Sequence, residues 1–296
     1  MPTIIDGTAI ADQFYGDIVQ EIDDLKKMHI QPKLGVILVG EHPASIMYVN
    51  MKRRKAEEIG IEVLLIHLPQ DSPEAEVQNR IEQFNNDNSV HAFLVQLPLP
   101  SHLNSSKLLR MIDPKKDVDG LHPSNIGLLA KGGKIEEMKS SIPCTPLGII
   151  ELLDRSNISI EGKNAVVVGR SNLVGFPVAT LLLHRNATVT ICHSRTRDLG
   201  HITRQADILV VAVGRPHLIK ENMVKKGAVV IDTGSGRLNG RLTGDVDFEH
   251  VAPRCSAITP VPGGVGPMTI AMIMKNTVRL AKAYAASLDN TNLSSH

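Results

Sequence analysis

One stretch near the middle of the chain decides which fold the sequence predicts. It reads Asn164-Ala-Val-Val-Val-Gly169-Arg170-Ser171-Asn172-Leu173-Val174-Gly175-Phe176-Pro177. The apolar run at its start is typical of a buried strand, and the glycine turn that follows leads into the start of a helix. Because the amides and dipole of a helix N-terminus attract anions, such a turn is the usual phosphate site of an α/β dinucleotide-binding fold.

The glycine fingerprint of this turn, Gly-x-Gly-x-x-Gly, is incomplete. Gly169 is present, but Ser171 stands at the second glycine position and Val174 at the third, just before Gly175. Ser171 could donate its hydroxyl, and Arg170 could bind a phosphate through its guanidinium group. We therefore expect a dinucleotide site here, with an ordinary strand-to-helix turn as the alternative.

The next expected strand, Thr188–Cys192, bears on the choice between NAD and NADP. An NAD site usually ends this strand with an acidic residue that binds the ribose hydroxyls. Here the strand runs into His193, Ser194 and Arg195, with no acid among them. A cation and a hydroxyl suit a 2′-phosphate, so we expect NADP; a solvated loop is the alternative for Ser194 and Arg195.

Two further strands end in residues that could approach the cofactor. The run Ile208–Val213 leads into Gly214, and Ala228–Ile231 leads through Asp232 to Thr233. Ligands of open α/β sheets bind at the carboxyl ends of the strands, where glycine lets the backbone come close. Each of these segments could equally be an ordinary turn.

Short apolar runs alternate with helical patterns along almost the whole chain. This order predicts parallel sheets covered by helices, and so an α/β fold. Helix starts are expected at Ser72-Pro73, with Ser72 as the N-cap, at Thr145-Pro146, and at Gly266-Pro267 for a last helix reaching about residue 286. The other expected strands are Leu34–Val39, Val63–Leu68, Ala92–Gln96, Ala165–Val168, Ala228–Asp232 and Ala257–Thr259.

Composition excludes several classes of protein. The 296 residues carry 32 Lys+Arg and 31 Asp+Glu, for a net charge of +1, with 3% aromatic residues and no Trp. This balance argues against nucleic acid or an anionic membrane as a partner. The cysteines Cys144, Cys192 and Cys255 are far apart, so we expect neither disulfides nor a metal site. With no signal peptide or membrane-length apolar run, we expect a cytoplasmic protein.

The first half holds polar residues that could form a second site. Tyr48 and Lys52 are four residues apart and would share one face of a helix. Lysine transfers protons near neutral pH only where its surroundings make the amine less basic, so a charged outer helix face is the alternative. Gln96 ends a strand and Asp119 lies in an Asp-Gly turn, and both positions are commonly just exposed. The Pro- and Gly-rich loop around Pro262-Gly263 could line a cleft or act as a hinge.

Six blocks of sequence together resemble one enzyme family. They are Tyr48-Val49-x-x-Lys52, Gln96-Leu97-Pro98-Leu99-Pro100, Lys116-Asp117-Val118-Asp119-Gly120, Pro143-Cys144-Thr145-Pro146, Gly169-Arg170-Ser171-x-x-Val174-Gly175-x-Pro177 and Pro260-Val261-Pro262-Gly263-Gly264-Val265-Gly266-Pro267-Met268-Thr269. In order and spacing the chain is similar to the bifunctional methylenetetrahydrofolate dehydrogenase/methenyltetrahydrofolate cyclohydrolases. The resemblance covers residues 1 to about 286.

The resemblance implies roles for the candidate residues. Lys52 would be the catalytic lysine, Gln96 would contact and tune it, Tyr48 would stack near the pterin, and Asp119 would anchor the pterin. The candidate catalytic residues are therefore Lys52, Tyr48, Gln96 and Asp119. The candidate substrate-binding residues are Tyr48, Asp119, Pro262 and Gly263. The candidate NADP-binding residues are Gly169, Arg170, Ser171, Val174, Gly175, Ser194, Arg195, Gly214 and Thr233, and no metal is implied.

The resemblance also implies the organisation of the protein. It implies two α/β domains around a cleft, the second a Rossmann-like doubly wound parallel sheet, with the last helix packing back on the first domain. Residues 1–142 with 268–296 would bind folate and residues 143–267 would bind NADP. The expected activity is NADP-dependent oxidation of 5,10-methylenetetrahydrofolate and hydrolysis of the product to 10-formyltetrahydrofolate, in one-carbon metabolism and purine biosynthesis. A homodimer through the second domain is implied too.

Other functions stay open at this point. The chain departs from the family at Gly234-Ser235-Gly236, where Gly-Ile-Asn is usual, which leaves the contact of this loop with the cofactor in question. A different NADP-dependent dehydrogenase, acting on a hydroxy acid or a shikimate-like substrate, is one alternative. A redox-sensing module without activity is another, and a dehydrogenase that has lost the cyclohydrolase reaction is a third.

Overall fold

The computed structural model describes residues 2–132, 141–238 and 240–293. Two compact units make up the chain. Unit 1 comprises Met1–Gln13, Leu129–Gly133 and Thr145–Met272, and unit 2 comprises Phe14–Leu128, Lys134–Cys144 and Ile273–His296. Two helices, α1 (Gly7–Lys27) and α10 (Val265–Leu293), begin in unit 1 and continue in unit 2.

Unit 1 is built around a parallel sheet. Its order is β1-β11-β8-β7-β5-β6, and all neighbours in it run parallel. Its strands are β1 (Thr3–Ile4), β5 (Asn164–Val168), β6 (Thr188–Cys192), β7 (Ile208–Val211), β8 (Val229–Asp232) and β11 (Ala257–Ile258). Its helices are α6 (Cys144–Arg155), α7 (Gly175–His184), α8 (Leu199–Thr203), η2 (Glu221–Met223), α9 (Phe248–Val251) and η3 (Ala252–Arg254).

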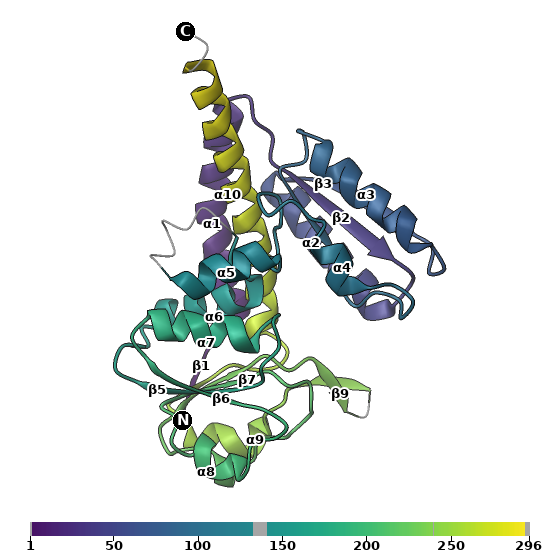
Figure 1. Ribbon diagram of the computed structural model, residues 1–296. Helices are drawn as coiled ribbons and strands as arrows, with labels where there is room; N and C mark the ends of the chain where they lie inside the picture. The colour runs from purple at the N-terminus through teal and green to yellow at the C-terminus, as the bar shows by residue number, and fades with distance from the viewer. Residues whose placement is uncertain (1, 133–140, 239, 294–296) are drawn as a thin grey trace. The chain divides into compact units, whose positions relative to one another are not determined.

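Helices cover both faces of this sheet, as the apolar strands predict. α6 and α7 lie on one side and α8 and α9 on the other (Figure 1). The central strands β5, β7 and β8 are buried almost throughout because neither face meets water. The chain goes from β5 out to β6 and then back to β7, so the winding direction reverses between β5 and β7. The predicted doubly wound sheet is thereby confirmed, with its ligand-binding crevice expected at that reversal.

Three strands of unit 1 were not predicted from the sequence. β1 has only two residues and pairs with β11, so it is too short for a periodic pattern. The antiparallel pair β9 (Gly236–Leu238) and β10 (Arg241–Thr243) is short as well. Because β1 pairs with β11, the compact unit takes in residues 1–13, which were expected to belong with residues 14–142.

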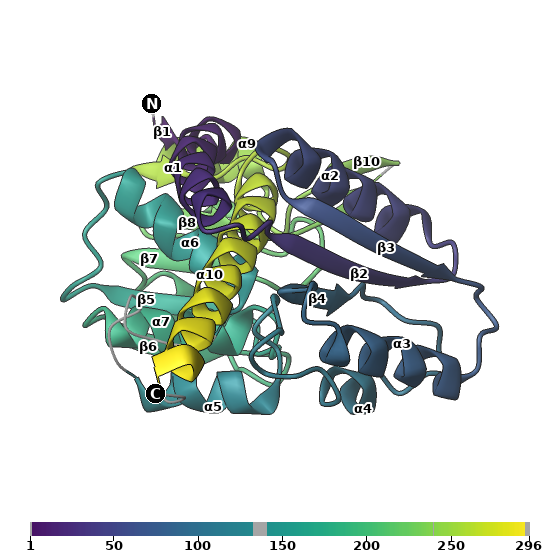
Figure 2. The same ribbon diagram turned by 90° about the horizontal axis from the view of Figure 1, so that it is seen from above.

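Unit 2 has a smaller sheet with the order β3-β2-β4, again parallel. Its helices α2 and α3 lie on opposite sides of the sheet (Figure 2), because the right-handed crossover from β2 to β3 and the one from β3 past β2 to β4 run in opposite directions across the sheet. The elements are β2 (Lys33–Val39), α2 (Pro43–Ile59), β3 (Glu62–Leu68), α3 (Glu74–Asn86), β4 (Ala92–Val95), α4 (Ser105–Leu109) and α5 (Pro123–Lys131). No helix in the described ranges combines the length and the apolar character needed to cross a bilayer.

Most expected helix starts agree with the structure, and two details do not. α6 begins at Cys144 and α10 at Val265, within two residues of the expected positions. Ser72 is not the N-cap of α3: Pro73 occupies that position, and the helix has no side-chain cap. α10 continues to Leu293, beyond the expected end near residue 286. Its second part packs within unit 2, where Lys275 and Lys282 bind Glu21 of α1.

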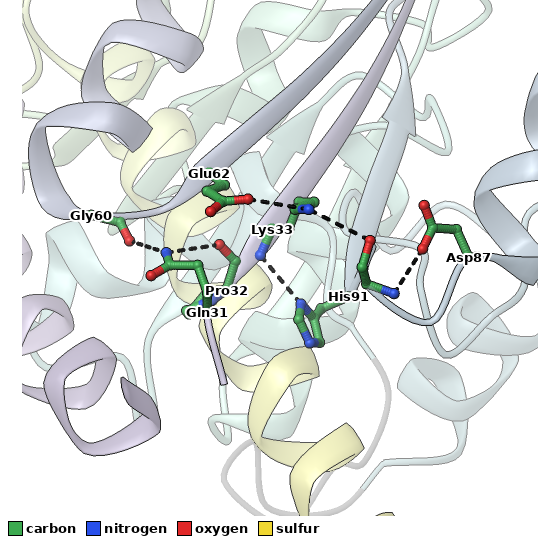
Figure 3. Close-up of polar contacts among 8 residues, drawn as sticks. Gln31, Pro32, Lys33, Gly60, Glu62, Asp87 and His91 are labelled. Atoms are coloured by element: carbon green, nitrogen blue, oxygen red, sulfur yellow. Dashed lines mark hydrogen bonds and ion pairs between the residues drawn. The ribbon is translucent and has the colours of Figure 1, made fainter. Parts of the chain in front are cut away.

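Polar contacts join the amino-terminal ends of the three strands in unit 2 (Figure 3). Lys33 at the start of β2 places its Nζ 3.1 Å from a carboxylate oxygen of Glu62 at the start of β3. The backbone N–H of Lys33 donates to Nδ1 of His91, just before β4, over 3.3 Å. Gln31 donates to the carbonyl of Gly60 over 2.7 Å. Side chains of unit 2 thus link the strands to one another at this end of the sheet.

His91 makes the stability of unit 2 depend on pH. Burial, helped by the positive charges of Lys116 and Lys33 and opposed by Asp87, lowers its pKa. Below the ordinary histidine pKa of about 6.5 the unfolded chain therefore binds a proton more readily than the folded one. The stability that neutral His91 contributes is present above pH 6.5 and decreases as the pH falls below it.

We predict that His91→Asn lowers the free energy of unfolding more at pH 7.5 than at pH 5, measured by urea denaturation. His250→Asn is the matched control with the opposite sign, because its hydrogen bond to Asp247 raises the pKa of the exposed His250. An effect of His91→Asn that does not change with pH would contradict this account.

Candidate active site

A buried lysine lies at the centre of the polar residues of unit 2. Lys52 belongs to the buried face of α2, which has Val49 and Ala56 one turn to either side, and only 7% of Lys52 is exposed. Its sequence neighbours Arg53 and Arg54 are exposed. The alternative of a solvated outer helix face is therefore wrong for Lys52, and a charged group this deeply buried requires polar partners.

Gln96 supplies the first partner. Its Oε1 accepts a hydrogen bond from Lys52 Nζ over 2.9 Å, while its Nε2 donates to the carbonyl of Leu97 over 2.6 Å. Because Nε2 faces a carbonyl, the amide can present only its oxygen to the lysine. β4 ends at Val95, and the N–H of Gln96 still donates to Ile37 of β2, so the sheet itself holds Gln96 in place.

Asp119 supplies a negative charge beside the lysine. Its turn runs next to β4, since Phe93 and Asp117 form an isolated parallel bridge and Asp119 follows two residues later. Burial raises the pKa of Asp119, and the positive charge of Lys52 opposes that rise. Asp119 is partly exposed and could meet a ligand.

Asp117, two residues earlier, has a different surrounding. It is 2% exposed, and its Oδ2 accepts hydrogen bonds from the N–H of His122 and from Nδ2 of Asn125, each over 2.8 Å. Burial raises its pKa to about 6, against the lowering effect of these two bonds. With these donors engaged, the Asp117 carboxylate holds the turn together.

Tyr48 lies on α2 one turn before Lys52, as the four-residue spacing predicts, and is half-buried. Ser45, one turn earlier again, is 2% exposed, and its hydroxyl has no hydrogen-bond partner among the described residues. Ser45 was not singled out from the sequence, where a serine in a helix has no distinguishing pattern.

Two further residues of this site were not assigned roles from the sequence. Cys144 donates its thiol to the carbonyl of Val118, and Asn276 of α10 donates to the same carbonyl over 2.9 Å and to that of Ile142 over 3.0 Å. Burial, reinforced by the negative charge of Asp119, raises the pKa of the Cys144 thiol. The thiol therefore stays protonated. Only the tertiary fold brings these residues to the Asp119 turn, so no local pattern could have found them.

The phosphate-loop candidate of unit 1 is a close-packed turn. Gly169 follows β5 with φ +131°, and a Cβ there would lie 2.3 Å from the carbonyl oxygen of Ala212, which follows β7. A Cβ on Gly175 would lie 2.3 Å from the carbonyl oxygen of Gly169. The close approach that the third fingerprint glycine usually permits therefore occurs at Gly175, one residue beyond Val174. The turn lies at the reversal between β5 and β7.

Ser171 and Arg170 are both exposed in this turn. The hydroxyl oxygen of Ser171 accepts from the N–H groups of Val174 and Gly175, over 3.2 and 3.5 Å. Its hydroxyl hydrogen is left to donate to a ligand. Both Ser171 and Arg170 are exposed, so each can reach an anion at the start of α7.

The loop after β6 fits a 2′-phosphate better than a free ribose. It folds into a tight turn in which the N–H of His193 donates to the hydroxyl of Thr196 over 2.8 Å, leaving Ser194 and Arg195 exposed. The first acidic residue, Asp198, uses its carboxylate to accept from the N–H of His201 at the start of α8. The loop thus presents a cation and a hydroxyl, and its nearest carboxylate is already engaged.

The ends of β7 and β8 are joined by hydrogen bonds. Buried Asp245 accepts from the N–H groups of Val213 and Gly214 through one oxygen, over 2.8 and 2.9 Å. A Cβ on Gly214 would point into open space, so the backbone there is accessible to a ligand. Thr233 instead donates its hydroxyl to Val211, over 3.0 Å, which ties β8 to β7.

Pro262 and Gly263 lie in the loop before α10 and belong to unit 1, whereas Lys52 belongs to unit 2. The carbonyl of Gly263 accepts from the N–H of Thr8 over 3.1 Å, so the loop is held by the start of α1. Within the described ranges, no three His, Cys, Asp or Glu side chains are grouped so that they could hold a metal ion.

The packing of Gly175 leads to a prediction about stability. Gly175→Ala forces two backbone segments apart, and we expect it to lower the free energy of unfolding by about 1–3 kcal/mol in chemical denaturation. Gly200→Ala in α8 is the control, because its Cβ would meet flexible side chains, Arg204 at 3.3 Å and Met223 at 3.5 Å, and no backbone atom outside its own helix within 4 Å. Equal effects of the two substitutions on the free energy of unfolding would contradict this prediction, because the backbone at Gly169 would then move aside at little cost.

Two family models match the chain. The model described as "Tetrahydrofolate dehydrogenase/cyclohydrolase, catalytic domain" matches residues 5–119, which include Tyr48, Lys52, Gln96 and Asp119. The model described as "Tetrahydrofolate dehydrogenase/cyclohydrolase, NAD(P)-binding domain" matches residues 143–285, which include the Gly169 turn.

Known proteins are similar over nearly the whole chain. "Bifunctional protein FolD" of Halothermothrix orenii is 54% identical over 284 residues, which cover 96% of this chain and 99% of the relative. The solved structure of bifunctional FolD, a methylenetetrahydrofolate dehydrogenase/cyclohydrolase, from Campylobacter jejuni has a TM-score of 0.92 at 47% identity, covering 96% and 99% of the two chains. The Trypanosoma brucei methylenetetrahydrofolate dehydrogenase-cyclohydrolase, solved with NADP cofactor and an inhibitor, has a TM-score of 0.89 at 38% identity, covering 95% and 98%.

Proposed function

The chain belongs to the tetrahydrofolate dehydrogenase/cyclohydrolase family, and from this premise we propose how its residues carry out the two reactions. It oxidises 5,10-methylenetetrahydrofolate to 5,10-methenyltetrahydrofolate with NADP and hydrolyses that product to 10-formyltetrahydrofolate. We propose that residues 1–142 with 268–296 bind the folate and that residues 143–267 bind NADP. The family match favours this function over a hydroxy-acid or shikimate-like dehydrogenase and over a redox-sensing module.

The oxidation depends mainly on orientation. Bound NADP would supply the hydride acceptor for the methylene carbon between N5 and N10 of the folate. The chain's part is to hold the folate at the right place, because a hydride transfer needs alignment more than acid–base help. Asp119 accepts hydrogen bonds from the amino and ring N–H groups of the pterin, and charge-assisted bonds of this kind are strong in a site shielded from water. Tyr48 packs beside the pterin, and Pro262 and Gly263 border the folate.

The hydrolysis needs proton transfers. Water attacks the methenyl carbon, the bond from that carbon to N5 breaks, and the formyl group stays on N10. Because the water oxygen becomes the formyl oxygen, both of its protons must leave: one is transferred to N5 and one is released to the solvent. Lys52 is the group we propose for these transfers, and Gln96 orients it through the 2.9 Å hydrogen bond to Nζ.

One observation carries the proposal: the buried Lys52 has both an amide acceptor and the partly exposed Asp119 beside it. A structural lysine would end in water or in a full ion pair. Here Asp119 is partly exposed, and the ammonium group is held by a neutral amide. That arrangement leaves both groups available to a substrate.

NADP is held, we propose, by the edge of the large sheet. The turn at Gly169 and Gly175 receives the pyrophosphate at the start of α7, with Ser171 and Arg170 as donors. Ser194 and Arg195 hold the 2′-phosphate. The nearest carboxylate, that of Asp198, already accepts a hydrogen bond from the N–H of His201. The accessible backbone at Gly214 and the residues Val174 and Thr233 complete the binding edge.

We also propose that the protein acts in the cytoplasm as a homodimer formed through the NADP-binding part. The three cysteines Cys144, Cys192 and Cys255 are free and buried, which suits a reducing compartment. The near-zero net charge supports small-molecule substrates over nucleic acid or membrane surfaces.

We predict that Lys52→Met abolishes hydrolysis of methenyltetrahydrofolate and leaves part of the dehydrogenase activity, because only the hydrolysis needs its proton transfers. Both activities are measured by absorbance, and the affinity for NADP is measured alongside. Arg54→Met, an exposed position on the same helix, is the control and keeps both activities. Loss of NADP binding in Lys52→Met would mean misfolding, and unchanged hydrolysis would remove Lys52 from the reaction.

Arg195→Ala tests the cofactor assignment. We expect it to raise the dissociation constant for NADP about tenfold or more, the effect of one lost charge-assisted bond, and to leave that for NAD nearly unchanged. The two constants are compared by fluorescence titration of the reduced cofactors. An equal effect on both cofactors would place the 2′-phosphate elsewhere.

A further inference from the structure

α10 buries two adjacent polar side chains, Asn276 and Thr277. Asn276 is 1% exposed and lies among buried residues such as Met272 and Val278. Burying an amide lowers stability unless hydrogen bonds replace those lost with water. Its neighbour Thr277 meets this requirement within the helix, by donating to the carbonyl of Ile273. Asn276 meets it outside the helix.

The Nδ2 group of Asn276 joins two other segments of unit 2. It donates to Val118 O over 2.9 Å and to Ile142 O over 3.0 Å, and it lies 3.4 Å from the thiol sulfur of Cys144. Because both carbonyls only accept, the amide orientation is fixed, and its own oxygen has no partner among the described residues. The side chain thus serves as a donor to neighbouring backbone.

The backbone held in this way carries Asp119. Val118 lies between the two aspartates of the turn, and its N–H also donates to Phe93 O over 3.3 Å, so the residue is fixed at both ends. Asp117 secures the turn through its own hydrogen bonds. The carboxylate of Asp119 has no hydrogen-bond partner among the described residues. Its position relative to Lys52 is therefore set by the backbone of the turn.

We infer that Asn276 is a positioning residue for both reactions, which holds the Asp119 carboxylate where it meets the folate. It acts at a distance from the substrate, through the carbonyl of Val118 and the segment at Ile142. The inference rests on the proposed role of Asp119 as the folate anchor. It adds a residue from the far end of the chain to the folate site.

The test compares Asn276→Leu and Asn276→Ser with Thr277→Val. Leucine has the same number and branching of side-chain heavy atoms as asparagine and no donor, and serine keeps a shorter donor for the case in which the leucine variant does not fold. Thr277→Val is the matched control: it is equally buried on the same helix, and its bond stays within α10. For each variant, the KM values for methylenetetrahydrofolate, methenyltetrahydrofolate and NADP are measured together with kcat and the thermal midpoint.

We expect both folate KM values to rise about tenfold in Asn276→Leu and less in Asn276→Ser, with the KM for NADP unchanged. A purely structural role would lower the thermal midpoint and the active fraction and leave every KM alone, as Thr277→Val should. Folded Asn276 variants that behave like Thr277→Val would overturn the inference.

A second measurement is independent of turnover. Amide hydrogen exchange of a peptide spanning residues 116–121 should be faster in Asn276→Leu than in Thr277→Val, because the Val118 carbonyl has lost its donor. Wild-type protein that turns over neither folate would contradict the proposed function. Equal exchange in the two variants would contradict the role of Asn276.

Discussion

The structure of unit 2 depends on keeping the Lys52 ammonium group partnered while it is buried. A charge removed from water without partners costs several kcal/mol, so the surroundings must supply acceptors. The fold does so with an amide at the end of β4 and a carboxylate on the turn that bridges to β4. α2 brings the lysine to them on its buried face. The strands, the turn and the helix are each needed to place one of the three groups.

The two sites are built by different means. In unit 1, backbone atoms form most of the surface of the candidate site. The turn at Gly169 packs against Ala212 and Gly175 so closely that a side chain on either glycine would not fit. Such a surface suits phosphates, which bind to N–H groups and helix ends. In unit 2, side chains form the candidate site, because the proposed proton transfer and pterin recognition need titratable groups at defined positions. One chain thereby supplies both a backbone edge suited to anions and a buried lysine with an amide and a carboxylate beside it.

Much of the fold was predictable from local patterns. The buried parallel strands read as continuous apolar runs, and the structure has a strand at each expected place. β1, β9 and β10 have only two or three residues each, which is too short for a pattern of alternating or continuous apolar residues to be recognised in the sequence. The prediction of the N-cap of α3 was wrong because a serine before a proline is typical of an N-cap, whereas Pro73 itself takes that position.

The folate site was harder to predict than the fold. Lys52 stands in a run of basic residues, and nothing local distinguishes the one buried lysine from its exposed neighbours. The resemblance to the family singled it out. The structure then shows the hydrogen bond to Gln96 that the resemblance implied. Asn276 and Cys144 reach the Asp119 turn from other parts of the chain, so they depend on tertiary contacts that no spacing records.

The most direct test of the central claim is a turnover assay of the unmodified protein. Methylenetetrahydrofolate is supplied with NADP and, separately, with NAD, and methenyltetrahydrofolate is supplied without nucleotide. The account predicts reduction of NADP in preference to NAD, together with loss of methenyltetrahydrofolate absorbance above the spontaneous rate. Intact NADP binding with no turnover of either folate would contradict it, because the Lys52, Gln96 and Asp119 cluster would then not be a folate site.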